Sequence, residues 1–153
     1  MTTFSLCMIV KNEENVLARC LDSLADLMDE IIIVDTGSTD KTKEIAARYT
    51  DRIYDFTWID DFAAARNFAA SKATMEYIYT ADADEFVDPE NHRQIRQLKE
   101  VLLPEVEIVQ MYYCNDLGDY NTTGNFEREL RPKLYRRQRS FTWIDPIHET
   151  LRL

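Results

Sequence analysis

Glycine is scarce in this 153-residue chain, with only Gly37, Gly118 and Gly124 present. Phosphate-binding loops of the dinucleotide-fold and P-loop types need several glycines, because their backbone amides must wrap around phosphate oxygens. The scarcity excludes both kinds of loop. A nucleotide bound by this chain would need cations to meet its phosphates.

The scarcity of cysteine and the lack of a long apolar run narrow the class of protein further. Three cysteines without CxxC spacing (Cys7, Cys20 and Cys114) exclude a disulfide framework or a zinc knuckle and suit a reducing cytosol. No apolar run approaches the ~20 residues of a membrane span, and the first residues lack signal-peptide features. We therefore expect a cytoplasmic protein without a transmembrane segment. The net charge of −10 argues against a nucleic-acid partner.

The pattern that is present predicts one α/β domain over residues 1–153. Apolar strand-like runs at residues 4–10, 30–35, 52–56 and 77–80 alternate with a helical pattern that Asn12 can cap and with helical patterns at 41–49, 62–73 and 89–103. Such alternation predicts a mostly parallel central sheet flanked by helices. Strands expected at 107–114, 128–138 and 141–143 have no helices between them. We therefore expect a mixed or antiparallel C-terminal portion.

Acidic clusters follow three of the expected strands. They are Lys11–Glu14, Asp35–Ser38 and Asp82–Glu85. In an open parallel sheet, ligands bind beyond the carboxyl ends of the strands. Each cluster alone could equally be a solvated loop, but together they predict one site.

The Asp82–Glu85 cluster predicts a metal site. Carboxylates this close repel one another, and a hard divalent cation relieves that repulsion. Asp82 and Asp84 are two positions apart, so on an extended chain they point the same way. Mn²⁺ or Mg²⁺ could then bridge them to a diphosphate.

Asp35–Ser38 reads DTGS, the string that surrounds the catalytic aspartate of aspartic proteases. Those proteases are all-β proteins with glycine-rich flaps. Here the string lies between a strand and a helix of an alternating chain, so we reject the protease interpretation.

Several further groups allow two interpretations each. Arg66 either extends to solvent or reaches a phosphate or base. The basic span 128–139 is either a charged edge strand or a wall facing an anionic substrate. His148 is either a third metal ligand or structural. Trp58 and Trp143 are either core residues or sugar platforms.

Four strings in order, FSLCMIVKNEE, EIIIVDTGSTDKT, WIDDFAAARNFA and YIYTADADEF, resemble family 2 glycosyltransferases. The likeness is nearest to bacterial members sometimes joined to tetratricopeptide repeats, and LRPKLYRR and IHE extend it more weakly. It implies a GT-A fold, a nucleotide-sugar donor, a divalent metal and inverting transfer. Carried onto matching positions, it implies that Asp35 contacts the base, Arg66 the donor, Asp82 the ribose or metal, and Asp84 the metal, with Glu13 near the nucleotide.

Two departures from the family pattern refine this expectation. The usual VDDGS reads VDTGS, so only Asp35 is carried over from that motif. The QxxRW string of processive synthases is missing, since residues 138–143 read QRSFTW. We therefore expect transfer of one sugar per encounter.

Together these features predict a metal-dependent glycosyltransferase of the hexosyltransferase type, with a UDP-sugar donor and a glycan, lipid or protein acceptor. Residues 1–103 would bind the donor and 104–153 the acceptor side. Glu149 or Asp145 would deprotonate the acceptor hydroxyl. Two alternatives stay open: a non-catalytic nucleotide-sugar-binding fragment, and a sugar-phosphate nucleotidyltransferase, which usually carries a glycine-rich loop where this chain has Lys11–Glu14.

Overall fold

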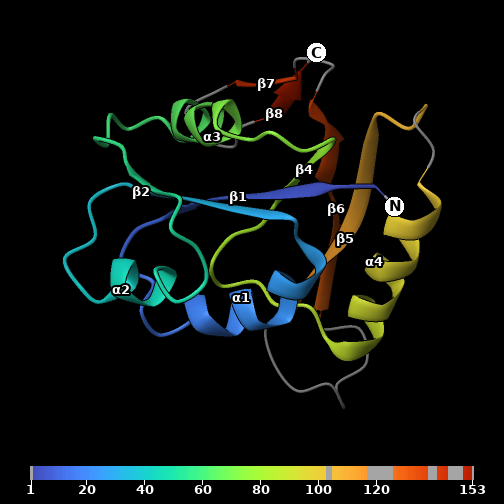
Figure 1. Cartoon of the computed structure of the whole chain (residues 1–153), viewed down its shortest axis with the longest axis horizontal. Coiled ribbons are helices and arrows are strands. Elements are labelled where there is room, and N and C mark those ends of the chain that lie inside the picture. Colours follow the sequence, from blue (N-terminus) through green and yellow to red (C-terminus); the bar gives the residue numbers. More distant parts are fainter. Residues whose placement is uncertain (1, 103–104, 117–125, 138–140, 145–149, 153) are drawn as a thin grey trace.

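A computed structural model describes residues 2–102, 105–116, 126–137, 141–144 and 150–152. Its main feature is a six-stranded sheet of order β3-β2-β1-β4-β6-β5 (Figure 1). A smaller sheet pairs β7 with β8. The strand bounds are β1 Phe4–Val10, β2 Glu30–Asp35, β3 Ile53–Asp55, β4 Tyr77–Thr80, β5 Ile108–Asp116, β6 Phe126–Arg136, β7 Thr142–Ile144 and β8 Thr150–Arg152.

Strand direction follows the predicted division of the chain. β1 to β4 run parallel, whereas β6 is antiparallel to β4 and β5 is antiparallel to β6. The predicted α/β class, with a mostly parallel sheet and an antiparallel C-terminal portion, is confirmed. β6 lies between β4 and β5 in the sheet order, but it pairs with β4 only over Leu134–Arg136, while Phe126–Pro132 pairs with β5 alone. The interpretation of the basic span as an edge strand therefore holds for only part of its length.

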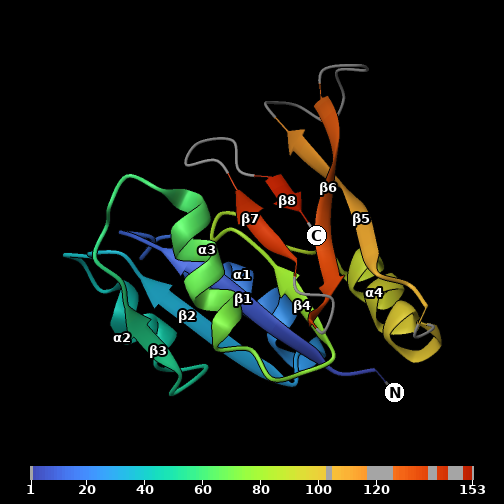
Figure 2. The same ribbon diagram turned by 90° about the horizontal axis from the view of Figure 1, so that it is seen from above.

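Helices cover both faces of the sheet. α1 (Leu17–Leu24), its 3₁₀ extension η1 (Ala25–Leu27), α2 (Thr42–Ala46) and α4 (Pro89–Val101) pack on one face, and α3 (Phe62–Ser71) with β7 on the other (Figures 1 and 2). Alternate residues of β1 and β2 enter the two cores, as the pleat requires. Each fully buried leucine or isoleucine contributes about 1.5–3 kcal/mol to stability. In the part of the chain described, no helix is long and apolar enough to cross a membrane.

Two helices begin where a carboxylate caps them. Asp88 accepts a hydrogen bond from the backbone N of Asn91 at 2.8 Å, at the predicted start of α4. Asp61 likewise accepts from Ala64 N at 3.1 Å at the start of α3. The expectation that Asn12 caps α1 is wrong, because this helix begins at Leu17 without a side-chain cap.

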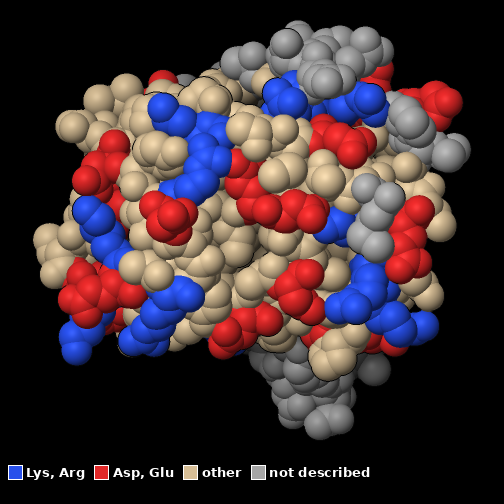
Figure 3. Space-filling model, in the orientation of Figure 1, with Lys and Arg blue, Asp and Glu red and all other residues tan. Residues whose placement is uncertain are grey.

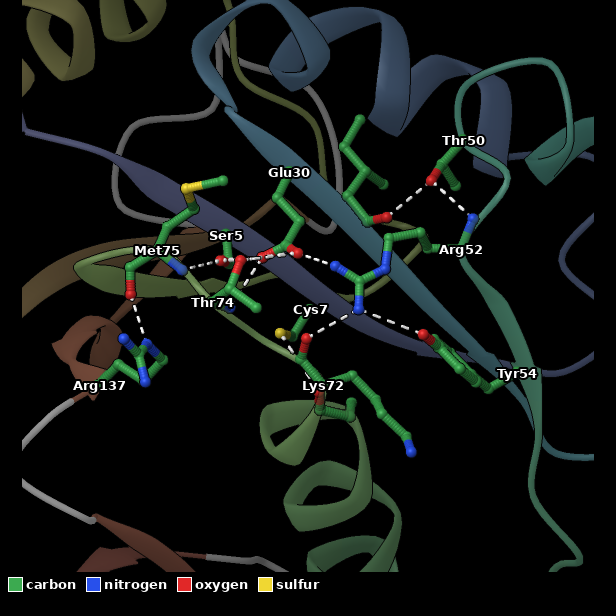
Figure 4. A network of polar contacts seen from close by, with 12 residues as sticks. Ser5, Cys7, Glu30, Thr50, Arg52, Tyr54, Lys72, Thr74, Met75 and Arg137 are labelled. Carbon is green, nitrogen blue, oxygen red and sulfur yellow. Dashed lines mark hydrogen bonds and ion pairs between the residues drawn. The ribbon is translucent and has the colours of Figure 1, made fainter.

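A buried polar network joins the strands at their amino ends (Figure 4). The carboxylate of Glu30, at the start of β2, accepts hydrogen bonds from Ser5 Oγ at 2.6 Å and Thr74 N at 2.9 Å and pairs with Arg52. Arg137 closes the network by donating to Met75 O at 2.6 Å. These partners satisfy a carboxylate that burial would otherwise penalise. The network therefore fixes the sheet at the edge opposite the three acidic clusters.

Candidate functional site

Three loops leave the sheet at the carboxyl edge of the parallel strands. β1 and β2 are in register, with Val10 opposite Asp35, and β4 pairs with the other side of β1. The loops after β1, β2 and β4 therefore lie side by side. We call the surface formed by Glu13, Asp35, Asp82 and Asp84 the acidic rim.

The carboxylates of the acidic rim crowd one another. The pKa of Glu13 is raised by its partial burial and then by the negative charges of Asp84, Asp82 and Asp40. These groups come from three separate loops, so their charges act on one shared space. Mutual repulsion of this kind favours a bound cation.

Asp35 is the most buried member of the rim, at 2% exposure. Its Oδ1 accepts hydrogen bonds from Gly37 N at 2.9 Å and Ser38 N at 2.8 Å, which fold the loop back over the strand end. Gly37 has φ of +123°, a conformation that suits glycine. Within the described residues, Asp35 Oδ2 has no hydrogen-bond partner. A buried acceptor without a partner is unusual and calls for a further donor.

Asn12 locks the first loop to the second, a role that the sequence reasoning missed. It has φ of +52°, which asparagine tolerates better than most residues. Its backbone N donates to Ser38 Oγ at 2.9 Å, and its Oδ1 accepts from Thr39 N at 2.8 Å. Next to it, Glu13 N donates to Thr42 Oγ1 at 2.8 Å. The two loops therefore form one wall of the site.

Asp82 lies between two arginines. Arg66 Nη2 donates to Asp82 Oδ1 at 2.9 Å, and Arg131 Nη1 lies 3.9 Å from Oδ2. Burial alone would raise the pKa of Asp82, but the charge and hydrogen bond of Arg66, with Lys133 and Arg131, hold it below its usual range. Asp82 is therefore ionised. The solvent-directed interpretation of Arg66 is wrong, since its side chain is 14% exposed and turns toward the rim.

The ring of Trp143 packs against the guanidinium group of Arg66. The guanidinium carbon lies 5.3 Å from the centre of the Trp143 ring, within cation–π range. Asn67 holds the same tryptophan through two backbone bonds, donating to its O at 2.8 Å and accepting from its N at 2.7 Å. Trp143 is 7% exposed, which favours the core interpretation, whereas Trp58 is half-buried and packs on Phe62.

The segment that carries Asp84 turns rather than staying extended. Glu85 N donates to Asp82 O at 3.0 Å, closing a turn around Ala83 and Asp84. Ala83 is buried, while Asp84 is exposed and Asp82 partly exposed. The turn, rather than the predicted strand-like alternation, leaves both carboxylates accessible. Arg19 of α1 donates to Asp84 O at 2.9 Å.

The basic span divides between the two edges of the sheet. Arg131 and Lys133 lie toward the acidic rim, pairing with Asp82 and Glu85. Arg136 stacks on Tyr77, and Arg137 contacts Met75 at the opposite edge. The span is therefore not one continuous wall. Over the face drawn in Figure 3, acidic and basic side chains are likewise interspersed.

Some predicted site residues lie outside the described residues. These are Asp145, His148 and Glu149, which follow β7. Among the residues that are described, no group of three or more His, Cys, Asp or Glu side chains is arranged to hold a metal ion.

The chain is similar in sequence to known bacterial proteins. It is 45% identical over 149 residues to a TPR repeat-containing protein of Synechococcus elongatus, covering 97% of this chain and 35% of that protein. It is 38% identical over 102 residues to the SPbeta prophage-derived glycosyltransferase SunS of Bacillus subtilis, covering 65% of this chain and 24% of SunS. The chain therefore spans about a quarter to a third of these curated relatives. The expected likeness to proteins with tetratricopeptide repeats is confirmed.

A solved structure supports the same assignment. The chain is similar to the crystal structure of TarS 1-349 from S. aureus, with a TM-score of 0.54 and 25% identity over 64% of this chain and 32% of that chain. The same TarS fragment has been crystallised in complex with UDP. The family model described as glycosyl transferase family 2 matches residues 5–150. With this match over nearly its whole length, the chain belongs to glycosyltransferase family 2.

Proposed function

We propose that this chain binds a UDP-sugar through a divalent metal and transfers its sugar to an acceptor hydroxyl, with inversion and one sugar per encounter. The observation that carries the proposal is the acidic rim. It combines a buried carboxylate, one oxygen of which has no partner among the described residues, with two exposed or partly exposed carboxylates. The partly buried Arg66 lies beside it. This set offers a partner to each part of a nucleotide diphosphate.

Asp35 is the proposed reader of the base. Its Oδ1 is held by two backbone amides, so its Oδ2 has a fixed direction. Uracil has an imide N–H that can donate a hydrogen bond to Asp35 Oδ2, whereas cytosine has no hydrogen at that ring position. The proposal of a uridine nucleotide rests on this difference. TarS, whose fragment shares the fold, is a protein crystallised with UDP.

Asp82 and Asp84 are the proposed metal ligands, with His148 as a third. Carboxylate oxygens suit Mn²⁺ or Mg²⁺, and the pKa of Glu13, raised by partial burial and then by the charges of Asp84, Asp82 and Asp40, fits a cation at this place. When bound, such a metal supplies positive charge that stabilises the leaving diphosphate. Arg66 adds a fixed cation beside Asp82, supported on Trp143. These groups replace the glycine-rich loop that the chain lacks.

Residues 104–153 are the proposed acceptor side, with residues 1–103 binding the donor. Asp145 or Glu149 would take the proton of the acceptor hydroxyl as that oxygen attacks the anomeric carbon. Both residues follow β7, which Asn67 ties to α3 beside Arg66. Attack from the face opposite the diphosphate gives the proposed inversion. The acceptor would be a glycan, a lipid or a protein.

A binding domain without turnover is the second candidate, because the chain spans about a quarter to a third of its relatives. Release of UDP from a panel of UDP-sugars, with Mn²⁺ and water as the acceptor, separates the two. We expect slow, Mn²⁺-dependent UDP release by the wild type and none by Asp84→Asn. Tight UDP-sugar binding without any release, with or without candidate acceptors, would favour the binding domain instead.

A further inference from the structure

We propose that Lys133 and Glu85 form a clamp that positions the segment carrying Asp82 and Asp84. This inference rests on the proposed function of that segment in metal binding. The two clamp residues would act through the segment and touch neither donor nor acceptor. They are thus positioning residues.

The clamp joins the segment to a distant strand. Lys133 Nζ of β6 donates to Glu85 Oε2 at 2.5 Å, and the two side chains are 10% and 12% exposed. The ammonium also lies 5.7 Å from the ring centre of Tyr79, at the end of β4. Glu85 directly follows Asp84 in the chain. The position of Glu85 therefore affects the direction of the neighbouring Asp84 carboxylate, which is exposed.

Arg66 of α3 and Arg131 of β6 hold the side chain of Asp82, whereas the described side chains that bind the backbone of the segment come from α1. Arg19 donates to Asp84 O at 2.9 Å, Ser23 Oγ accepts from Val87 N at 3.1 Å, and the Cys20 thiol lies 3.7 Å from Asp82 O. These contacts reach the backbone from one side. Lys133 instead binds the side chain of Glu85, and it does so from β6. Its bond therefore restrains the segment from a direction that α1 does not.

The chemistry of the pair indicates positioning rather than stabilisation. Removing two charges from water costs free energy that offsets much of their attraction, so a buried ion pair contributes little net stability. Within the described residues, Glu85 Oε1 has no hydrogen-bond partner, which makes the carboxylate depend on Lys133. Loss of the lysine would leave a buried charge beside Asp82. The carboxylate would then turn toward water and carry the segment with it.

Lys99 provides a matched control. It is also a buried lysine, with Nζ 2.6 Å from Asp29 Oδ2, and it also lies over an aromatic ring, 5.2 Å from the centre of Phe4. Its partners, Leu27 O and Asp29 Oδ2, lie just before β2 and next to the first residue of β1, at the edge opposite the acidic rim. A general cost of losing a buried lysine would therefore appear in both variants, whereas a shift of residues 82–87 would appear only in Lys133→Met.

Hydrogen exchange of residues 82–87 without ligand and calorimetry of UDP with Mn²⁺ test the clamp. We expect Lys133→Met to speed the exchange and to weaken Mn²⁺-dependent UDP binding at least about tenfold, as outer-layer partners of metal ligands do. Lys99→Met should leave both unchanged. Slow exchange and full affinity in Lys133→Met would overturn the clamp.

The double variant Lys133→Met with Glu85→Gln separates positioning from stability, since it leaves no unpaired charge. We expect its Tm to return toward the wild-type value while UDP affinity stays low, and it carries the test if Lys133→Met does not fold. Recovery of affinity together with Tm would show a structural pair only and overturn the clamp. A wild type that binds no UDP with Mn²⁺ would instead overturn the proposed function, while the exchange data still judge the clamp.

Discussion

Asp84→Asn is expected to abolish metal-dependent UDP binding and to leave the fold intact. Asp84 is exposed at the tip of a turn, and its backbone O, not its carboxylate, holds the contact with Arg19. An exposed substitution of this kind changes stability by about 0.5 kcal/mol or less. The pKa of Glu13 is raised first by partial burial and next by the charge of Asp84, so loss of that charge should relieve repulsion in the ligand-free protein. The loss of UDP affinity should exceed about a hundredfold, beyond the cost of losing an outer-layer partner.

Calorimetry with UDP and Mn²⁺, beside thermal unfolding of the ligand-free protein, measures both effects. Asp51→Asn is the control, because Asp51 is an exposed carboxylate before β3, at the opposite edge of the sheet. It should leave UDP binding unchanged. Wild-type affinity in Asp84→Asn would remove Asp84 from the metal site, and a large fall in its Tm would show a structural role.

Asp35→Ala is expected to weaken uridine nucleotides more than cytidine nucleotides. A hydrogen bond to a charged group contributes about 1.5–3 kcal/mol, which is roughly ten- to a hundredfold in affinity. Alanine also removes the acceptor of the Gly37 and Ser38 amides, so some loss for both nucleotides comes from the loop. The difference between the affinities for UDP and CDP, measured by competition binding, isolates the contribution of the contact between Asp35 and the base.

Asp35→Asn sharpens this test. Its amide oxygen can keep the two backbone bonds, which places the NH₂ group where Oδ2 lies in the wild type. That group opposes the imide N–H of uracil and can donate to the ring nitrogen of cytosine. The nucleotide preference of Asp35→Asn should therefore shift toward CDP, and nucleotide binding should still depend on Mn²⁺. Equal losses for UDP and CDP in both variants would mean that Asp35 shapes the loop and does not read the base.

Local patterns were sufficient to predict the elements that form the site. The apolar runs of β1, β2 and β4 mark buried parallel strands, and the carboxylates after them necessarily reach one edge of the sheet. Asp88 and Pro89 mark the start of α4 within one residue. Each of these features is encoded within a few consecutive residues.

Contacts between distant segments were the part that sequence reasoning could not supply. Asn12 was assigned to a helix cap because its partner loop, 26 residues away, is invisible to a local pattern. The basic span of β6 could not be divided between two edges without knowing its register against β4, in which Tyr79 lies opposite Leu134. The pairing of Lys133 with Glu85 depends on the same register. β8 was also not predicted.

The central claim is that a divalent metal joins UDP to Asp82 and Asp84. The most direct measurement is calorimetric titration of the wild-type chain with UDP, once with Mn²⁺ and once with EDTA. We expect binding only with Mn²⁺, and UDP at ~100 times its Kd should then add about 2.7 kcal/mol to the free energy of unfolding. Equal UDP affinity in EDTA would contradict the claim, because the acidic rim would then hold a diphosphate without a metal.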